Sequence, residues 1–435
     1  MAKSRRPVGI DLFAGVGGLS LGFEQAGFDV AASLEIDPIH CATHEYNFPK
    51  TAILCADATK IRGKDFLDRI GLKKGEVDVV FGGPPCQGFS LIGKRLSDDP
   101  RNQLLFHFLR LVDEIRPACF VMENVAGLTI GPSKSVLEAF LDSATEIGYD
   151  TVRPPRVLNA ANYGVPQNRR RVFVLGFRRG NKEPLYPEAA TFARNQDGTP
   201  LEPRDKSIVE LPTCPSVKEA IGDLPNIDDF PALLESDSVR HKLPAGSRYA
   251  RLLKCELKDP SDLSYPRVFD RSILTGSLRA VHTDESKRRF KATLHGETEP
   301  ISRFFKLPPE GISNTLRAGT PSNRGAFTSP RPIHPDHHRC ISVREAARLH
   351  SYPDWFRFHV TKWHGFRQVG NSVPPLLGRA IAGSVARALG IVPKRPEDKM
   401  ALGEAKLLSL DMSEAAEMYS VPRHVIEPRV RASAP

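Results

Sequence analysis

The sequence predicts an α/β fold in which a mostly parallel sheet is covered by helices and interrupted by a smaller, irregular domain. Between residues 8 and 177, short β-branched runs alternate with stretches of helical periodicity, as such a sheet requires. After Arg178 the chain is rich in proline, glycine and basic residues up to about residue 336, and its periodicity is poor. Helical periodicity then returns. A length of 435 residues is sufficient for two cores.

The expected strands are short apolar runs bounded by turn residues: Val8–Phe13, Val30–Ile36, Val77–Phe81, Cys119–Glu123 and Arg171–Phe177. The expected helices are Leu19–Ala26, Ile39–Tyr46, Asn102–Ile115, Ser135–Ile147, Val343–His350 and Pro375–Leu389. These elements divide the chain into a sheet domain (1–179), the inserted domain (180–336), a return to the sheet domain (337–392) and a C-terminal appendage of open role (393–435).

Composition narrows the class of protein. The 61 lysine and arginine residues exceed the 51 aspartate and glutamate residues, and a net charge of +10 suits a polyanionic partner. No apolar run approaches the roughly 20 residues that a membrane span needs. The basic N-terminus has no apolar signal-peptide segment behind it, so a cytoplasmic protein is expected. Seven cysteines without a C-x-x-C pair argue against a disulfide framework and a zinc ribbon.

The first motif, residues 11–22, joins a strand to a helix through a glycine-rich turn. Gly15, Gly17 and Gly18 let the backbone approach a ligand at the start of the helix. Ser20 stands where a dinucleotide fingerprint beginning at Gly15 requires glycine, which favours a ligand without a pyrophosphate. Glu35 ends the next strand, where an acid can accept both ribose hydroxyls. Taken alone, this motif also fits other nucleotide-binding α/β domains.

The second motif runs from Gly82 to Ser90 and contains a Pro-Pro-Cys-Gln turn. It follows a predicted strand, so it lies at the carboxyl end of the sheet, where open α/β sheets bind ligands. Pro84 and Pro85 stiffen the approach to Cys86, and glycines flank them. This arrangement favours an accessible thiol over a buried, unreactive cysteine.

Two further motifs bring charged groups to the same edge. The strand that begins at Cys119 ends with Glu123 and Asn124, and a carboxylate at the end of an apolar strand indicates a site residue more often than a helix cap. In the run from Gln167 to Phe173, strand alternation places Arg169 and Arg171 on one face and Arg170 on the other. The arginines are interpreted as a clamp for an anion or a base carbonyl, although a solvated edge is an alternative.

Together these blocks resemble the cytosine-C5 DNA methyltransferases over about residues 8–390. Three further parts of the sequence resemble the same family: Asp57, the run that begins at Arg344 and the block Gln368–Pro374. It implies a Rossmann-like, S-adenosylmethionine-dependent methyltransferase sheet with an inserted target-recognition domain. It also implies a monomeric enzyme acting on double-stranded DNA in a bacterial restriction-modification system, in which a cognate restriction endonuclease can act on the same site.

The resemblance implies the catalytic roles. Cys86 is expected to add as a thiolate to cytosine C6, which makes C5 nucleophilic. Glu123 is expected to protonate or hydrogen-bond N3, Arg169 to hold the base carbonyl, and Arg171 to support the site. The target base has to be flipped out of the duplex to reach Cys86.

The resemblance also implies contacts with S-adenosyl-L-methionine and with DNA. Phe13 is expected at the adenine face, Glu35 at the ribose and Asp57 at the adenine amino group. The other residues expected at the cofactor are Gly15, Gly17, Gly18, Leu19, Pro84, Asn371 and Ser372. The residues expected at the DNA are Gln87, Ser90, Arg101, Thr315 and Leu316.

Several competing interpretations are weaker. The run His334-Pro-Asp-His-His-Arg-Cys340 looks like a metal cluster, but no second ligand group completes it, so no metal is expected. Residues 412–425 resemble the opening of a helix-turn-helix, and a docking helix is favoured over it. A tRNA-directed relative is expected to carry a Cys-Phe-Thr element, which the sequence lacks, and a non-catalytic DNA-binding regulator to lack the thiol or the acid. Ser20 and the Pro-Pro-Cys-Gln loop exclude an NAD-type oxidoreductase.

Overall fold

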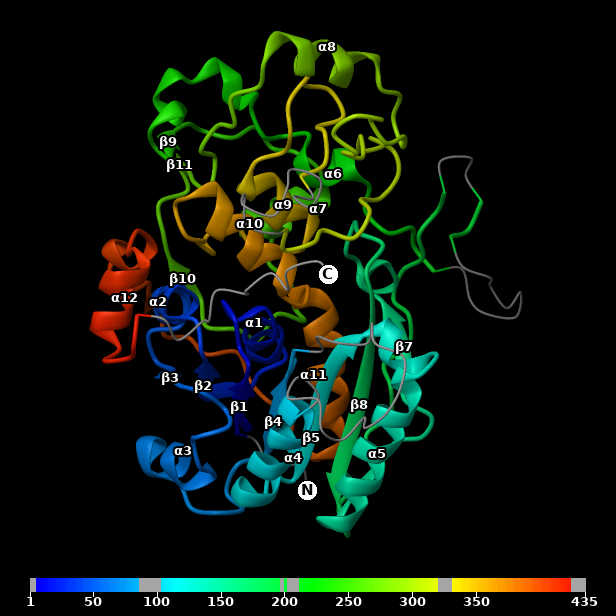
Figure 1. The fold of residues 1–435 in the computed structure, drawn as a ribbon, viewed down its shortest axis with the longest axis vertical. Coiled ribbons are helices and arrows are strands. Elements are labelled where there is room, and N and C mark those ends of the chain that lie inside the picture. Colours follow the sequence, from blue (N-terminus) through cyan, green and yellow to red (C-terminus); the bar gives the residue numbers. More distant parts are fainter. Residues whose placement is uncertain (1–4, 86–102, 196–198, 202–210, 320–330, 424–435) are drawn as a thin grey trace, which may run out of the picture.

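The computed structural model describes residues 5–85, 103–195, 199–201, 211–319 and 331–423. Its lower half in Figure 1 is a sheet with helices on both faces, and the inserted segment makes up much of its upper half. The predicted α/β class with a mostly parallel sheet is confirmed.

The central sheet has the strand order β3-β2-β1-β4-β5-β8-β6, with β7 paired to β8. The first five strands of this order are parallel, so their carboxyl ends share one edge, whereas β8 runs antiparallel to β5, β6 and β7. The strands are β1 (Val8–Leu12), β2 (Asp29–Glu35), β3 (Ala52–Cys55), β4 (Val79–Gly82), β5 (Cys119–Val125), β6 (Tyr149–Thr151), β7 (Arg156–Asn159) and β8 (Arg170–Arg178).

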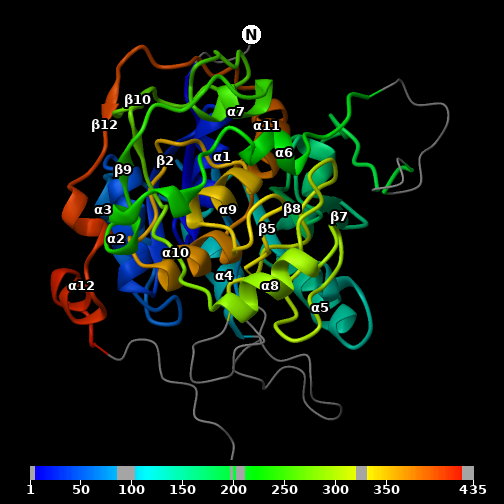
Figure 2. The same ribbon diagram turned by 90° about the horizontal axis from the view of Figure 1, so that it is seen from above.

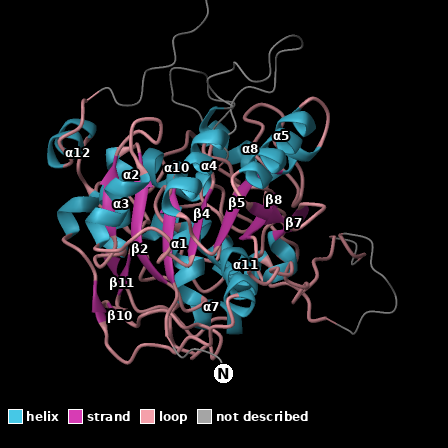
Figure 3. Cartoon of the chain, turned by 90° about the horizontal axis from the view of Figure 1, so that it is seen from below, coloured by secondary structure: helices cyan, strands magenta, loops and turns pink. Residues whose placement is uncertain are grey.

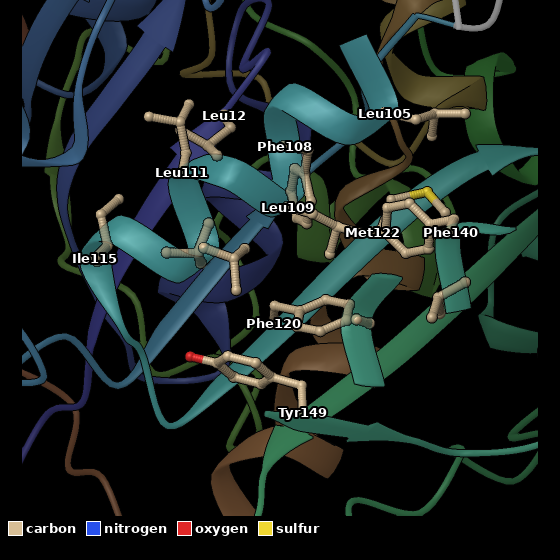
Figure 4. Packing of buried hydrophobic residues seen from close by; sticks show 14 of the residues in the cluster. Leu12, Leu105, Phe108, Leu109, Leu111, Ile115, Phe120, Met122, Phe140 and Tyr149 are labelled. Carbon is tan, nitrogen blue, oxygen red and sulfur yellow. The ribbon is translucent and has the colours of Figure 1, made fainter. Parts of the chain in front are cut away.

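Helices cover both faces of this sheet, and the strands lie between them in Figure 3. The helices α3, α4 and α5 pack on one face, where Phe120 of β5 meets Phe108 and Phe140 edge-on or nearly so (Figure 4). The helices α1 and α11 pack on the other face. The bounds are α1 (Gly18–Gln25), α2 (Pro38–Asn47), α3 (Gly63–Ile70), α4 (Gln103–Ile115), α5 (Ser133–Glu146) and α11 (Pro375–Ala388).

The inserted segment does not stand apart from the sheet domain. A third core cluster joins Val16 and Leu21 of the first motif to α6, α7, α9 and α10. Residues 259–268 return to α1, where the Leu263 N–H donates to the Gln25 carbonyl at 2.8 Å. The elements of this half are α6 (Val217–Ile221), β9 (Val239–Arg240), α7 (Arg248–Leu253), β10 (Arg267–Val268), β11 (Ile273–Leu274), α8 (Asp284–Ala292), α9 (Val343–Leu349) and α10 (Lys362–Asn371). Short 3-10 turns join several elements: η1 (Ala126–Thr129), η2 (Ala160–Tyr163), η3 (Ile227–Asp229) and η4 (Pro231–Leu234).

The C-terminal segment is docked along the sheet domain as far as the structure describes it. Strand β12 (Met400–Ala401) pairs in parallel with β10. The 3-10 turn η7 (Ala405–Leu408) and helix α12 (Met412–Met418) then pack against α2, beside which α12 lies in Figures 1 and 2. The Tyr419 hydroxyl lies 2.6 Å from Glu45 Oε2. This packing fits the predicted docking helix, and a second helix of a helix-turn-helix would fall beyond residue 423, outside the described residues.

Candidate active site

The glycine-rich turn after β1 leaves an open space beside a fixed carboxylate. Phe13, Gly15 and Gly17 have φ values of 59°, 54° and 93°, so the chain turns through left-handed conformations. The Gly15 N–H donates to Glu35 Oε2 at 2.8 Å, and Glu35 Oε1 accepts from two backbone N–H groups at 2.9 Å. Among the described residues, no atom other than those of Gly15 and its two chain neighbours lies within 4 Å of the position that a Cβ at residue 15 would take. The turn and Glu35 therefore form a cradle that a ligand can enter.

A segment from the far end of the chain packs on this turn. A Cβ at residue 18 would lie 2.7 Å from the Tyr352 hydroxyl and 2.9 Å from Ser372 Cβ, so only glycine fits there. Ser372, which the resemblance implies at the cofactor, therefore lies directly against this turn. Asn371 is exposed at the end of α10.

Three other residues expected at the cofactor have different surroundings. Asp57 is half-buried just beyond β3, and its Oδ1 accepts from the Thr59 N–H at 2.9 Å. The side chains of Phe13 and Leu19 pack into the two core clusters on opposite faces of the sheet. Leu19 is 5% exposed, so its backbone, rather than its side chain, is the part available to a ligand at the turn.

An ion pair stands at the end of β5. Glu123 Oε1 lies 2.9 Å from Arg171 Nε, and both side chains are largely buried. A Cβ at residue 83 would lie 2.6 Å from Glu123 Oε2, so the loop after β4 passes directly over the carboxylate. Burial raises the pKa of Glu123, and the neighbouring Arg171 and Arg169 oppose that rise. The buried carboxyl group therefore takes up a proton more readily than an exposed glutamate does.

The loop that leads to Cys86 is anchored at its start. Asn124 Nδ2 donates to the carbonyl of the buried Pro84 at 3.0 Å. The predicted site residues Cys86, Gln87, Ser90 and Arg101 lie outside the described residues. The described part of the site is thus the Glu123–Arg171 pair and the anchored beginning of this loop.

Arg169 has contacts that differ from the role implied by the resemblance. Its side chain is buried; Nη1 donates to the Leu316 carbonyl at 2.8 Å, and Nη2 donates to the carbonyls of Gly370 and Ser372 at 2.9 and 2.8 Å. Arg171, not Arg169, is paired with Glu123. Burial follows the predicted alternation, because Arg170 between them is exposed.

The dipeptide Thr315-Leu316 packs on the chain just before β8. Thr315 Oγ1 lies 2.6 Å from the Asn168 carbonyl, and the Leu316 N–H donates to Gln167 Oε1 at 3.1 Å. The structure therefore brings these two residues of the inserted segment next to Arg169.

The histidine-rich run is organised by hydrogen bonds and an ion pair. His334 Nδ1 accepts from the N–H groups of Asp336 and His337, and Arg339 makes two hydrogen bonds to Glu345. Among the described residues, no group of three or more His, Cys, Asp or Glu side chains is arranged to hold a metal ion.

The sequence motifs did not assign roles to three side chains that organise the site. Asn124 anchors the Pro84 loop, and the buried Gln167 and His350 contact each other at 2.9 Å. Asn124 and Gln167 lie inside motifs that are recognised in the sequence, so those motifs could have indicated a role for them. No motif indicates a role for His350, because the partners of its side chain are far away in the sequence.

Comparison with known proteins agrees with this architecture. Residues 8–387 match the family model of the C-5 cytosine-specific DNA methylases. The Type II methyltransferase M.XorII of Xanthomonas oryzae pv. oryzae is 52% identical over 426 residues, covering 98% of this chain and 95% of that protein. The Type II methyltransferase M.AgeI of Thalassovita gelatinovora is 32% identical over 434 residues, covering 87% and 99%. A solved E. coli structure, described as a DNA modification methyltransferase encoded within a prophage, matches with a TM-score of 0.68 and 32% identity over 88% of this chain and 99% of that one.

The fold and the site define a methyltransferase that uses a methyl donor of the S-adenosylmethionine type. More specifically, the chain belongs to the family of C-5 cytosine-specific DNA methylases, and the two relatives named above are both called Type II methyltransferases. None of the described helices is long and apolar enough to cross a membrane.

Proposed function

We propose that this enzyme transfers a methyl group from S-adenosyl-L-methionine to C5 of a cytosine flipped out of a specific duplex DNA sequence, through a covalent bond between Cys86 and C6. The observation that carries the proposal is the Glu123–Arg171 pair at the end of β5, with the loop toward Cys86 tied to the same strand through Asn124.

The cradle beside Gly15 suits the cofactor. S-adenosylmethionine supplies the electrophilic methyl group when it is bound. The open space at Gly15 and the carboxylate of Glu35 fit an amino-acid end and a ribose, and the close packing of Gly18 on Ser372 closes the pocket. Asp57 is assigned to the adenine amino group, because it lies just beyond the neighbouring strand β3.

Each catalytic residue has a different role in making C5 reactive. Cys86, as a thiolate, forms a bond to C6 and leaves C5 electron-rich. Glu123 donates its proton to N3 as charge builds in the ring, which suits a carboxyl group whose pKa is raised by burial. We assign the base carbonyl to Arg171, because Arg169 already uses both terminal nitrogens on backbone carbonyls. Once C5 carries the methyl group, its proton leaves to water, the electron pair of the C–H bond re-forms the C5–C6 double bond and expels the Cys86 thiolate, and N3 returns its proton to Glu123.

The names of the relatives support a role in restriction and modification. We propose that methylation protects host DNA from a restriction endonuclease that cuts the same sequence. The target sequence can be found by bisulfite sequencing of DNA from a methylation-free host that expresses the chain. Purified tRNA is tested in parallel, and methylation of tRNA alone would overturn the DNA assignment.

The first prediction concerns Cys86. Cys86→Ser should abolish methylation while cofactor binding persists, because a serine hydroxyl is a far weaker nucleophile near neutral pH. The wild type, incubated with 5-fluorocytosine DNA and cofactor, should form an adduct that survives denaturation, because fluorine at C5 blocks elimination. Cys255→Ser, in the second half of the molecule, serves as the control and should still form the adduct. An active enzyme that forms no adduct contradicts the covalent mechanism.

The second prediction concerns Glu123. Glu123→Gln should lower kcat by roughly 10²–10⁴-fold with little change in the cofactor KM, because the amide keeps a similar shape but cannot supply the proton. Single-turnover rates across pH 6–9 provide the measurement. In the wild type, the rate should fall once the pH exceeds the pKa of this carboxyl group, which burial raises. A loss that appears in the cofactor KM instead would show that Glu123 acts outside the chemical step.

A further inference from the structure

A closed set of hydrogen bonds joins the dipeptide of the inserted segment to the cofactor side of the site. The Leu316 N–H donates to Gln167 Oε1 at 3.1 Å, and Gln167 Nε2 lies 2.9 Å from His350 Nδ1. His350 Nε2 lies 3.0 Å from the Ser372 carbonyl oxygen. Arg169 completes the ring, because it donates to the carbonyls of Leu316 and Ser372 at 2.8 Å each.

The chemistry of the partners fixes the direction of each bond. The Ser372 carbonyl can only accept, so His350 donates from Nε2 and accepts from Gln167 at Nδ1. The Gln167 amide is fixed in turn, because the Leu316 N–H requires its oxygen. Gln167 and His350 are fully buried, and burial together with the nearby Arg169 lowers the pKa of His350 well below its usual range. The His350 imidazole is therefore neutral, and each of its two nitrogens has one assigned role.

Backbone packing reinforces the same connection. A Cβ at residue 370 would clash with the backbone of Arg317 and Ala318, so the segment after the dipeptide lies directly on α10. The next residues of the chain reach Ser372, whose Cβ closes on Gly18 of the cofactor turn. Close-packed contacts of this kind transmit a displacement because they have little room to deform.

We propose that His350 is a positioning residue that couples target recognition to the cofactor pocket. It holds the Ser372 carbonyl at a place that is set, through Gln167, by the backbone of Leu316. The inference rests on the proposed function, in which Ser372 closes the cofactor pocket, and on the expectation from the family resemblance that Thr315-Leu316 contacts the DNA. Wild-type methylation of DNA is therefore established first; if it is absent, the proposed function fails and the coupling is not at issue.

Two substitutions separate the two sides of the ring. In His350→Asn, the amide stands near the position of Nδ1, so the bond to Gln167 can form and the bond to Ser372 is lost. In His350→Gln, the longer side chain can reach the Ser372 carbonyl and the bond to Gln167 is lost. We expect His350→Asn to raise the KM for S-adenosylmethionine roughly tenfold and to keep discrimination between target and single-mismatch DNA. We expect His350→Gln to keep that KM within about twofold and to lower discrimination roughly fivefold.

The same two substitutions at the exposed His338 serve as controls and should change neither quantity. The proposal is overturned if both His350 variants change KM and discrimination in parallel, as general destabilisation would produce. It is also overturned if both variants behave like the wild type.

A measurement on the unmodified protein keeps the proposal testable if the variants do not fold. S-adenosylhomocysteine, a methyl-free probe of the pocket, is added and hydrogen exchange is followed by mass spectrometry. The peptide that contains Leu316 should become several-fold slower in exchange, together with the peptide that contains residues 370–373, although only the latter lies at the pocket. Protection confined to residues 370–373 would show that the ring carries no coupling.

Discussion

Asp11 and Glu123 are buried carboxyl groups with very different neighbours. Glu123 is paired with Arg171 at 2.9 Å. Asp11 receives the Ser20 hydroxyl at 2.6 Å on Oδ2, while its Oδ1 has no hydrogen-bond partner among the described residues. Burial raises the pKa of Asp11 to about 8, and the nearby Glu35 contributes in the same direction. Asp11 is therefore held as a neutral acid at the start of the cofactor turn.

This state predicts how stability depends on pH. The folded protein keeps a proton on Asp11 that the unfolded chain releases near pH 4, so the stabilisation is complete below that pH and is lost as the pH rises through about 8. Asp11→Asn, which imitates the neutral acid, removes this dependence. Urea unfolding at pH 5, 7 and 9 should show the variant gaining stability relative to the wild type at each step. Parallel pH curves for the two proteins would contradict a raised pKa at Asp11.

At the scale of residues, the sequence predicted which side of a strand a residue faces and where a strand ends. It predicted hydrogen-bond partners less well. Strand alternation correctly placed Arg169 and Arg171 on one side, and the second strand ends at Glu35, as predicted. The contact between Glu35 and the Gly15 N–H was not predicted. The partners of Arg169 could not be predicted, because its acceptors lie 147 to 203 positions further along the chain. The roles expected for the two arginines, Arg169 at the base carbonyl and Arg171 in support of the site, therefore came from the family resemblance alone.

At the scale of elements, long periodic segments were predicted well and short ones were missed. Each of the five predicted strands corresponds to an observed one, with ends that differ by at most two residues. Strands β3, β6 and β7 have only three or four residues, too few to show a period. The antiparallel direction of β8 was also not predicted, because it depends on tertiary pairing with β5.

The C-terminal segment, predicted as an appendage, contributes to a core cluster. Leu407 and Leu408 of η7 are buried against Ala42 and Tyr46 of α2. The Val360 N–H donates to the Leu408 carbonyl at 2.9 Å, so η7 also contacts the segment before α10. The apolar residues of η7 did not indicate this packing, because a turn of four residues has no period.

This packing predicts that two substitutions in the C-terminal segment have very different effects on the free energy of unfolding. Leu408→Ala should lower the free energy of unfolding by about 2–5 kcal/mol, because it leaves a cavity under η7. Met418→Ala, at a position that is 44% exposed in α12, should change it by less than about 0.5 kcal/mol. Urea denaturation of the full-length chain measures both. Equally small changes would mean that the segment is not docked in solution.

At the scale of the whole molecule, the inserted segment is also part of the sheet domain. Arg267 lies within the segment predicted as 180–336, yet its guanidinium makes two hydrogen bonds to Glu24 of α1, at 2.7 and 2.8 Å. Both side chains are almost fully buried. Removing one partner of such a pair costs about 3–5 kcal/mol, because the remaining charge is buried without compensation. A division of the chain at residues 180 and 336 therefore cuts through a structural contact.

The final prediction follows from this contact and from the expectation, implied by the family resemblance, that the inserted segment recognises the target DNA sequence. We expect a chimera that takes the equivalents of residues 180–258 and 269–336 from the 32% identical M.AgeI, and keeps residues 259–268 of this chain, to fold and to methylate the site of the donor. The Arg267–Glu24 pair is retained, and the residues assigned to catalysis lie outside the exchanged parts. A second chimera that exchanges all of 180–336 and lacks an arginine at 267 should be less stable by about 3–5 kcal/mol. Bisulfite sequencing gives the methylated site and urea denaturation gives the stability. If the first chimera is active but keeps its original site, recognition lies in the sheet domain, the retained residues 259–268 or the C-terminal segment, because those are the parts that were not exchanged.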